Sequence, residues 1–361
     1  MSSVQERNVL LVGSLPYETV DEGMRTAGEL LGDQLLGIPD GEVGLRKIWI
    51  GFLPRTVYSS HPDLRLTRSP EGGVQEQPDA KPEVWEASFM FALKPGVTKL
   101  RFENLGYADA ALESYKTFSK LRDEGTIPAG VKFQVCLPAT GSAVSYFFSE
   151  PEEWPIAHDA YHEAIGREIE KILTVVPPED LQIQFDFAME FVDLAVGDKR
   201  SIGHWPEATY EEKLTRHAAT IGPLTERVPD DVVLGIHWCY GTWGGWPMKD
   251  MGTLATCVEM SNRAKTQSAH DLSYIHMPVS LEPDDKFFAP LRDLDVGDTD
   301  IYLGLVHHTD GVEGCQRRIE LAHKYLDSFG IGAVCGYGRV DPSELPDILR
   351  LHEECSHAVA L

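Results

Sequence analysis

The sequence predicts an α/β fold in which eight parallel strands and their helices close into a (β/α)8, or TIM, barrel. Short apolar, β-rich runs alternate with longer amphipathic stretches along nearly all of the 361 residues, which is typical of βαβ units and a parallel sheet. Most of the runs are continuously apolar, as expected of strands that are buried on both faces. A doubly wound open sheet is the alternative. No change in composition marks a domain boundary, so we expect residues 1–361 to form one domain.

Eight apolar runs are the expected barrel strands, and the amphipathic stretches between them are the expected helices. The strand candidates are Asn8–Gly13, Gln34–Ile38, Val131–Leu137, Leu181–Phe187, Val232–Trp238, Leu272–Met277, Ile301–Val306 and Ile331–Cys335. The helix candidates are Asp21–Leu31, Ala108–Asp123, Pro155–Thr174, Glu207–Glu226, Asp250–Ser268, Glu313–Ser328 and Pro342–Cys355.

A long insertion is expected after the second strand, over approximately residues 44–104. A barrel of this type typically has about 250 residues, so the chain has room for one. Residues 55–82 are rich in Pro, Gly, Ser and charged residues, which suits a long loop over one end of the barrel. Val97–Asn104 also has the pattern of a strand and would be a ninth, so we assign it to this insertion.

The net charge, and the lack of a membrane-span or signal-peptide pattern, argue against several classes of function. The chain has 32 Lys and Arg against 57 Asp and Glu, a net charge of −25, and such a field repels the phosphates of nucleic acids and anionic lipids. No apolar run approaches the ~20 residues of a membrane span, and the polar N-terminus passes directly into the first strand without the pattern of a signal peptide. We therefore expect a cytoplasmic protein that binds neither nucleic acid nor membrane. Nothing in the sequence specifies an oligomeric state.

The strongest local signal for chemistry is GIHWCYG, at the end of the fifth expected strand. His237 and Cys239 lie two positions apart, so their side chains point to the same side of a strand. They would lie at the carboxyl end of the barrel, where active sites are found. Cys335 ends the eighth strand and His276 the sixth, and imidazole and thiolate are good zinc ligands. We predict a zinc site of His237, Cys239 and Cys335, with His276 as the candidate fourth ligand.

Structural roles are the alternative for these residues, because buried Cys and His are common in protein cores. The six cysteines form no CxxC pair, and without an export signal free thiols or metal ligands are favoured over disulfides. Gly336 and Gly338 would let the backbone turn tightly after Cys335. We interpret the remaining cysteines as packing residues: Cys136, Cys257, Cys315 and Cys355.

A second group of polar residues is expected at the same end of the barrel. Asp186 closes the fourth strand in QIQFDFAME, and Glu42 follows the second in GIPDGEVG. A carboxylate at the end of an apolar strand is costly to bury without a partner, so both could hold the ammonium group of a substrate; Glu42 could equally be a turn residue. Ser14, after the first strand, could contact a substrate carboxylate. His307 and His308 end the seventh strand, where either could transfer protons near neutral pH.

Taken in chain order, these strand ends resemble the C-terminal catalytic barrel of cobalamin-independent methionine synthase, in the superfamily that also contains uroporphyrinogen decarboxylase. LVGSLP is similar to that family's first-strand IGSFP segment, GIPDGEVG to its Gly-Glu motif, VCLPATGSA to TGPVT, and QIQFDFAME to IQIDEPA. GIHWCYG resembles its zinc-binding HxC strand, and AVCGYGR resembles the strand that ends in its last zinc cysteine. The resemblance spans nearly the whole chain.

The resemblance implies a barrel that uses zinc to activate a thiol for alkyl transfer. The zinc ligands would be His237, Cys239 and Cys335, and the residues that bind the amino-acid substrate would include Ser14, Glu42 and Asp186. The family's sixth-strand ligand is a glutamate where this chain has His276, so either His276 replaces it or zinc keeps three protein ligands and an open position. The family's catalytic histidine aligns with His308 after a one-residue shift.

The expected function is transfer of a methyl or other alkyl group to a small thiol such as homocysteine, with Zn²⁺ as cofactor and a thiolate as nucleophile. The partners would be that thiol and an alkyl donor, which could be folate, methylcobalamin or another compound. Two other enzyme classes remain open: a zinc-dependent enzyme that makes or breaks carbon–sulfur bonds, such as an epoxide–thiol transferase, and a metal-free enzyme similar to uroporphyrinogen decarboxylase. A non-catalytic zinc protein would need a closed site, with His276 or Glu259 as fourth ligand.

Overall fold

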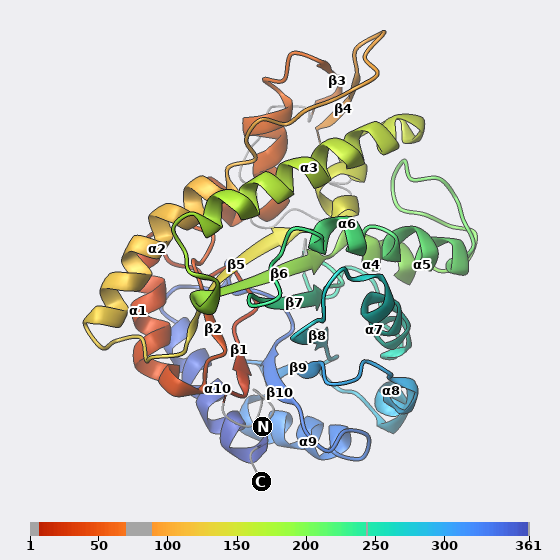
Figure 1. Ribbon diagram of the computed structural model, residues 1–361. Coiled ribbons are helices and arrows are strands. Elements are labelled where there is room, and N and C mark those ends of the chain that lie inside the picture. The colour runs from red at the N-terminus through yellow and green to blue at the C-terminus, as the bar shows by residue number, and fades with distance from the viewer. Residues whose placement is uncertain (1–6, 70–88, 243–244, 360–361) are drawn as a thin grey trace.

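The computed structural model describes residues 7–69, 89–242 and 245–359, and eight parallel strands form the centre of this part of the chain (Figure 1). The strand order is β1-β10-β9-β8-β7-β6-β5-β2, and a parallel bridge between Val9 and Leu35 links the two outer strands into a nearly closed barrel. The prediction of a (β/α)8 barrel is confirmed. The strands are β1 (Val9–Leu10), β2 (Gly37–Pro39), β5 (Lys132–Pro138), β6 (Leu181–Phe187), β7 (Val233–Trp238), β8 (Tyr274–Pro278), β9 (Asp300–Val306) and β10 (Gly330–Ala333).

Helices surround the strands on the outside, as Figure 1 shows. They bury their apolar faces against the sheet, so that most strand residues are inaccessible from both sides. The helices are α1 (Val20–Leu31), α2 (Tyr107–Asp123), α3 (Trp154–Leu173), α4 (Met189–Ala195), α5 (Tyr210–Ala218), α6 (Ile221–Thr225), α7 (Ala255–Gln267), α8 (Asp285–Phe288), α9 (Gly311–Ala322) and α10 (Leu345–Val359). Among the residues described, no helix is long and apolar enough to cross a membrane.

One expected helix, Glu207–Glu226, is two helices in the structure. A capping box between Thr209 and Glu212 starts α5, which ends at Ala218, and α6 begins at Ile221. Pro223 has no N–H to donate to a residue four positions earlier, so one continuous helix would lack that hydrogen bond. Two further helices, α4 and α8, were not predicted; α4 begins two residues after β6 ends, and α8 has only four residues.

The insertion after β2 contains helical turns and an antiparallel hairpin. A 3-10 helix covers Gly44–Phe52 and a π-helix covers Pro54–Tyr58. The hairpin of β3 (Leu64–Arg68) and β4 (Met90–Leu93) projects from the barrel (Figure 1). The prediction of a strand over Val97–Asn104 is wrong, because this segment is irregular. Leu100 and Phe102 are buried without a partner strand, and the ring of Phe102 packs 5.3 Å from that of Tyr58.

A polar network fills part of the barrel interior and leads towards the carboxyl ends of the strands. Gln182 donates hydrogen bonds to Gln134 Oε1 and to the Tyr274 hydroxyl, both at 2.9 Å, and Tyr274 donates to Gln184 Oε1 at 2.9 Å. Gln184 in turn donates to Asp186 Oδ1 at 2.8 Å. Because alternate residues of a strand share a face, positions 182, 184 and 186 of β6 form one inward-facing row that ends at Asp186.

Candidate active site

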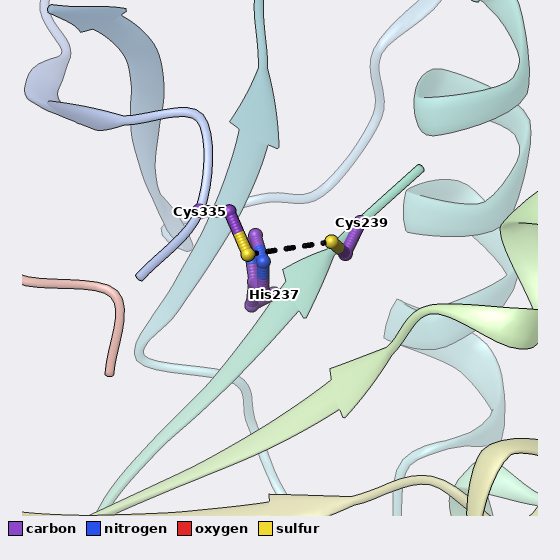
Figure 2. A group of neighbouring side chains, drawn as sticks. All are labelled: His237, Cys239 and Cys335. Carbon is purple, nitrogen blue, oxygen red and sulfur yellow. Dashed lines mark hydrogen bonds between the residues drawn. The ribbon is translucent and has the colours of Figure 1, made fainter. Parts of the chain in front are cut away.

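Three residues from distant parts of the chain meet at the carboxyl ends of β7 and β10. The ligand atoms of His237, Cys239 and Cys335 all lie within 4.8 Å of one another, and among the described residues they form the one group of His, Cys and acidic side chains placed to hold a metal ion. The Sγ atoms of Cys239 and Cys335 are 3.6 Å apart (Figure 2). The structure thus brings together the three residues for which the sequence predicts a zinc site.

Strand register explains this convergence. Asp186, His237 and His276 are paired across β6, β7 and β8, so their side chains lie side by side in the barrel. Cys239 follows two positions after His237 and points to the same side. β10 pairs with β1 and β9 and is separated from β7 by β9 and β8, and Cys335 lies two residues beyond the end of β10.

The donor atoms of this group suit a metal ion. His237 is 2% exposed, and its Nε2 is buried without a hydrogen-bond partner among the described residues. The backbone N–H of Gly241 donates to Cys239 Sγ at 3.3 Å. The hydrogen bond from Cys239 and the neighbouring His237 imidazole hold the pKa of Cys335 well below its usual value, while the bond to Cys335 and burial raise the pKa of Cys239. The pair therefore releases its first proton easily, which favours metal binding.

His276, the candidate fourth ligand, contacts His237 and is not part of the three-residue group. Its Nδ1 lies 2.8 Å from Nδ1 of His237, and the ring centroids are 4.8 Å apart. The side chain is fully buried, and burial holds the pKa of His276 well below its usual value. The His276 imidazole is therefore a neutral neighbour of His237.

Two carboxyl groups lie at the same end of the barrel. Asp186 is 7% exposed, and burial, reinforced by the charge of Glu42, raises its pKa well above the usual value. Burial raises the pKa of Glu42 to about 8; the Arg46 charge opposes this, and the charges of Asp40 and Cys335 add to it. Among the described residues, no hydrogen bond or ion pair satisfies the Glu42 carboxyl group. Both carboxyls are thus placed where a cation would stabilise them.

The loop after β2 holds Glu42 in a strained conformation. Its φ is +53°, in the left-handed region that non-glycine residues rarely adopt, and such strain costs about 1–3 kcal/mol. Asp40 Oδ1 accepts the backbone N–H of Glu42 at 3.0 Å, and Arg46 pairs with Asp40 at 2.6 Å. The sequence interpretation missed Arg46, whose position six residues after Asp40 gave no distinctive spacing.

The loop that follows Cys335 packs closely against Ser14 and donates hydrogen bonds to it. The backbone N–H of Tyr337 donates to the Ser14 carbonyl at 2.7 Å, and that of Gly338 to Ser14 Oγ at 3.3 Å. A Cβ atom at Gly336 or Gly338 would lie 2.5 or 2.9 Å from Ser14 Oγ. The backbone turns here as expected, with the N–H of Val340 donating to the Tyr337 carbonyl at 3.0 Å, but neither glycine has a positive φ. They are needed for close approach to Ser14.

The histidines after β9 differ in environment. His307 is half-buried; its Nε2 lies 2.9 Å from the Val279 carbonyl, and its ring packs edge-on against Trp246 at 5.9 Å. Burial lowers the pKa of His307 to about 4, so its imidazole is neutral near pH 7. His308 is exposed. Trp246, which the sequence interpretation did not single out, has a buried Nε1 without a partner among the described residues.

The other cysteines lie on a barrel strand or on the helices and are buried. Cys136 contacts Gln134 and the Val12 carbonyl inside the barrel. Cys257 lies on α7, Cys315 on α9 and Cys355 on α10.

Comparison with known proteins finds similarity of structure alone. No model of a known protein family matches the chain, and no curated protein matches its sequence. A B12-independent methionine synthase from Shewanella sp. W3-18-1, solved in complex with selenomethionine, superposes with a TM-score of 0.60 at 14% identity, over 98% of this chain and 97% of that one. A putative vitamin-B12-independent methionine synthase from Listeria monocytogenes superposes with a TM-score of 0.55 at 14% identity, over 94% of this chain and 86% of that one. The chain therefore has the fold of methionine-synthase-like barrels.

Proposed function

We propose that this protein is a zinc-dependent enzyme of the B12-independent methionine synthase type, which transfers a methyl or other alkyl group to a small thiol. The observation that carries the proposal is the position of the His237, Cys239 and Cys335 group beside two buried carboxyls that have no ion-pair partner among the described residues. The structural similarity to one B12-independent methionine synthase and one putative one supports it, and the first was solved with selenomethionine, the selenium analogue of an amino-acid thioether.

The residues of the group fit zinc. Two thiols and one imidazole are a donor set that zinc accepts, with one position left for a further ligand. The unpartnered Nε2 of His237 supplies the imidazole lone pair, and the two sulfurs are adjacent. When bound here, zinc would hold a substrate thiol in its deprotonated, nucleophilic form.

The remaining residues would bind and orient an amino-acid thiol. Glu42 and Asp186 would receive the ammonium group, because a positive charge relieves the cost of burying them. The Ser14 hydroxyl accepts from Gly338 and keeps its own proton for a substrate carboxylate. The neutral ring of His307 would accept a hydrogen bond or proton, and His308 would supply a proton to the leaving group. Homocysteine is the first candidate for the thiol.

Metal analysis combined with thiol titration tests the proposal. We expect about one zinc per chain, lost in His237→Ala and Cys335→Ser but retained in Cys355→Ser, a buried cysteine on α10 that serves as control. Addition of homocysteine should release about one proton per zinc, and methyl-donor assays should give a methylated thiol. Purified protein that contains no zinc but is still a functional enzyme would favour the metal-free alternative, an enzyme similar to uroporphyrinogen decarboxylase.

The donor assays also separate the two zinc-dependent classes. A protein that binds zinc and thiol, but alkylates the thiol with an epoxide and with no methyl donor, belongs to the carbon–sulfur bond-forming class. A protein whose zinc binds no added thiol has a closed structural site, and that result would refute an enzymatic role for the metal.

A further inference from the structure

We propose that His276 is a positioning residue, which holds the His237 ring through Nδ1 and does not bind the metal. The fourth position of the metal is then open to the substrate thiol. This inference rests on the proposed function, because it assumes a metal at His237, Cys239 and Cys335. It concerns the part that this chain's own histidine pair plays in that site.

The distance between the two rings is that of a hydrogen bond. Their Nδ1 atoms are 2.8 Å apart. Two nitrogens bound to one tetrahedral zinc at ~2.0–2.1 Å would be separated by roughly 3.3 Å. His276 is fully buried and lies outside the group whose ligand atoms are within 4.8 Å of one another. The contact therefore joins two rings through a shared proton.

The position of that proton decides whether His237 can bind a metal. If His237 Nδ1 donates to His276 Nδ1, the Nε2 of His237 keeps a free lone pair, which a metal requires. The opposite arrangement would place a proton on that Nε2 and leave no lone pair there for a metal. Metal binding thus requires His276 to accept at Nδ1 and to carry its own proton on Nε2.

β10 leaves room for this orientation of His276. A Cβ atom at Gly332 would lie 3.3 Å from His276 Nε2 and 3.5 Å from Cδ2, closer than most side-chain contacts. Because Gly332 has no side chain, the His276 imidazole can pack against the β10 backbone, three residues before Cys335. Partners that orient a metal-binding histidine in this way typically contribute 10–100-fold to metal affinity.

Zinc X-ray absorption of the wild-type protein, together with chelator competition, tests the inference without relying on activity. We expect two sulfurs and one imidazole at the zinc. His276→Phe, which removes the acceptor, should weaken zinc binding about 10–100-fold but keep one zinc, two sulfurs and one imidazole. His276→Asn is the matched control, because its amide oxygen lies near the position of Nδ1; it should bind zinc within about threefold of wild type.

A wild-type spectrum with two imidazoles would overturn the inference and leave the proposed function standing. Equal zinc affinity of wild type, His276→Phe and His276→Asn would overturn it as well. Absence of zinc from the wild-type protein would instead refute the proposed function, and the inference with it. The wild-type spectrum decides the number of imidazoles even if His276→Phe fails to fold.

Discussion

Replacement of Glu42 by glutamine should stabilise the metal-free protein increasingly as the pH rises. Glu42 has a pKa of about 8 in the folded protein against a usual value of 4.5. The folded state therefore binds more protons than the unfolded state between these pH values, and the wild-type protein loses stability across this window. Each pH unit is worth about 1.4 kcal/mol. Glutamine keeps the size and backbone conformation of the residue but removes the carboxyl group.

The expected gain in the free energy of unfolding is close to zero at pH 4, about 3 kcal/mol at pH 7 and about 5 kcal/mol at pH 9. Urea unfolding of both proteins at these pH values measures it, with Glu113→Gln, an exposed site on α2, as control. A difference between wild type and Glu42→Gln that stays within about 1 kcal/mol from pH 4 to pH 9 would refute the reasoning. A cationic ligand should reduce the difference, because it favours the charged carboxylate.

Two substitutions and one titration test other parts of the structure. Gly336→Ala places a Cβ 2.5 Å from Ser14 Oγ and should destabilise the fold by about 1–3 kcal/mol and lower zinc content; unchanged zinc content would contradict this. Asp193→Asn leaves the fully buried Lys213 without its 3.4 Å ion partner and should cost about 3–5 kcal/mol in urea unfolding; a loss below about 1 kcal/mol would contradict it. The pKa of His307 is lowered to about 4, so an NMR titration should find its ring neutral at pH 6. The free energy of unfolding should fall as the pH drops from 6.5 towards 4, because the unfolded state then binds a proton that the folded state does not. A measured pKa of His307 above 6 would contradict this prediction.

The barrel could be predicted because its strands are buried on both faces and so are apolar at consecutive positions. β6 matches the prediction at both ends, Leu181–Phe187. The site followed from two simple rules: residues two apart share a face of a strand, and parallel strands end at one edge. These rules placed His237 with Cys239 and brought Cys335 to them.

Contacts between side chains at that edge could not be predicted. The sequence places His276 at the end of a strand, but the orientation of its ring, towards a metal or towards His237, depends on the room left by Gly332. The pairing of Arg46 with Asp40 depends on the path of a loop. The Val97–Asn104 prediction failed because apolar residues that fill space under an insertion have the same pattern as a strand.

Cys239 and Cys335 are 96 positions apart, with β8 and β9 between them. During synthesis, a nascent chain therefore exposes His237 and Cys239 long before the second sulfur leaves the ribosome. A metal held by all three residues would favour only those molecules in which β10 has inserted between β1 and β9. Metal occupancy would then report completion of the barrel, and truncated or misassembled chains would remain metal-poor and distinguishable from finished protein.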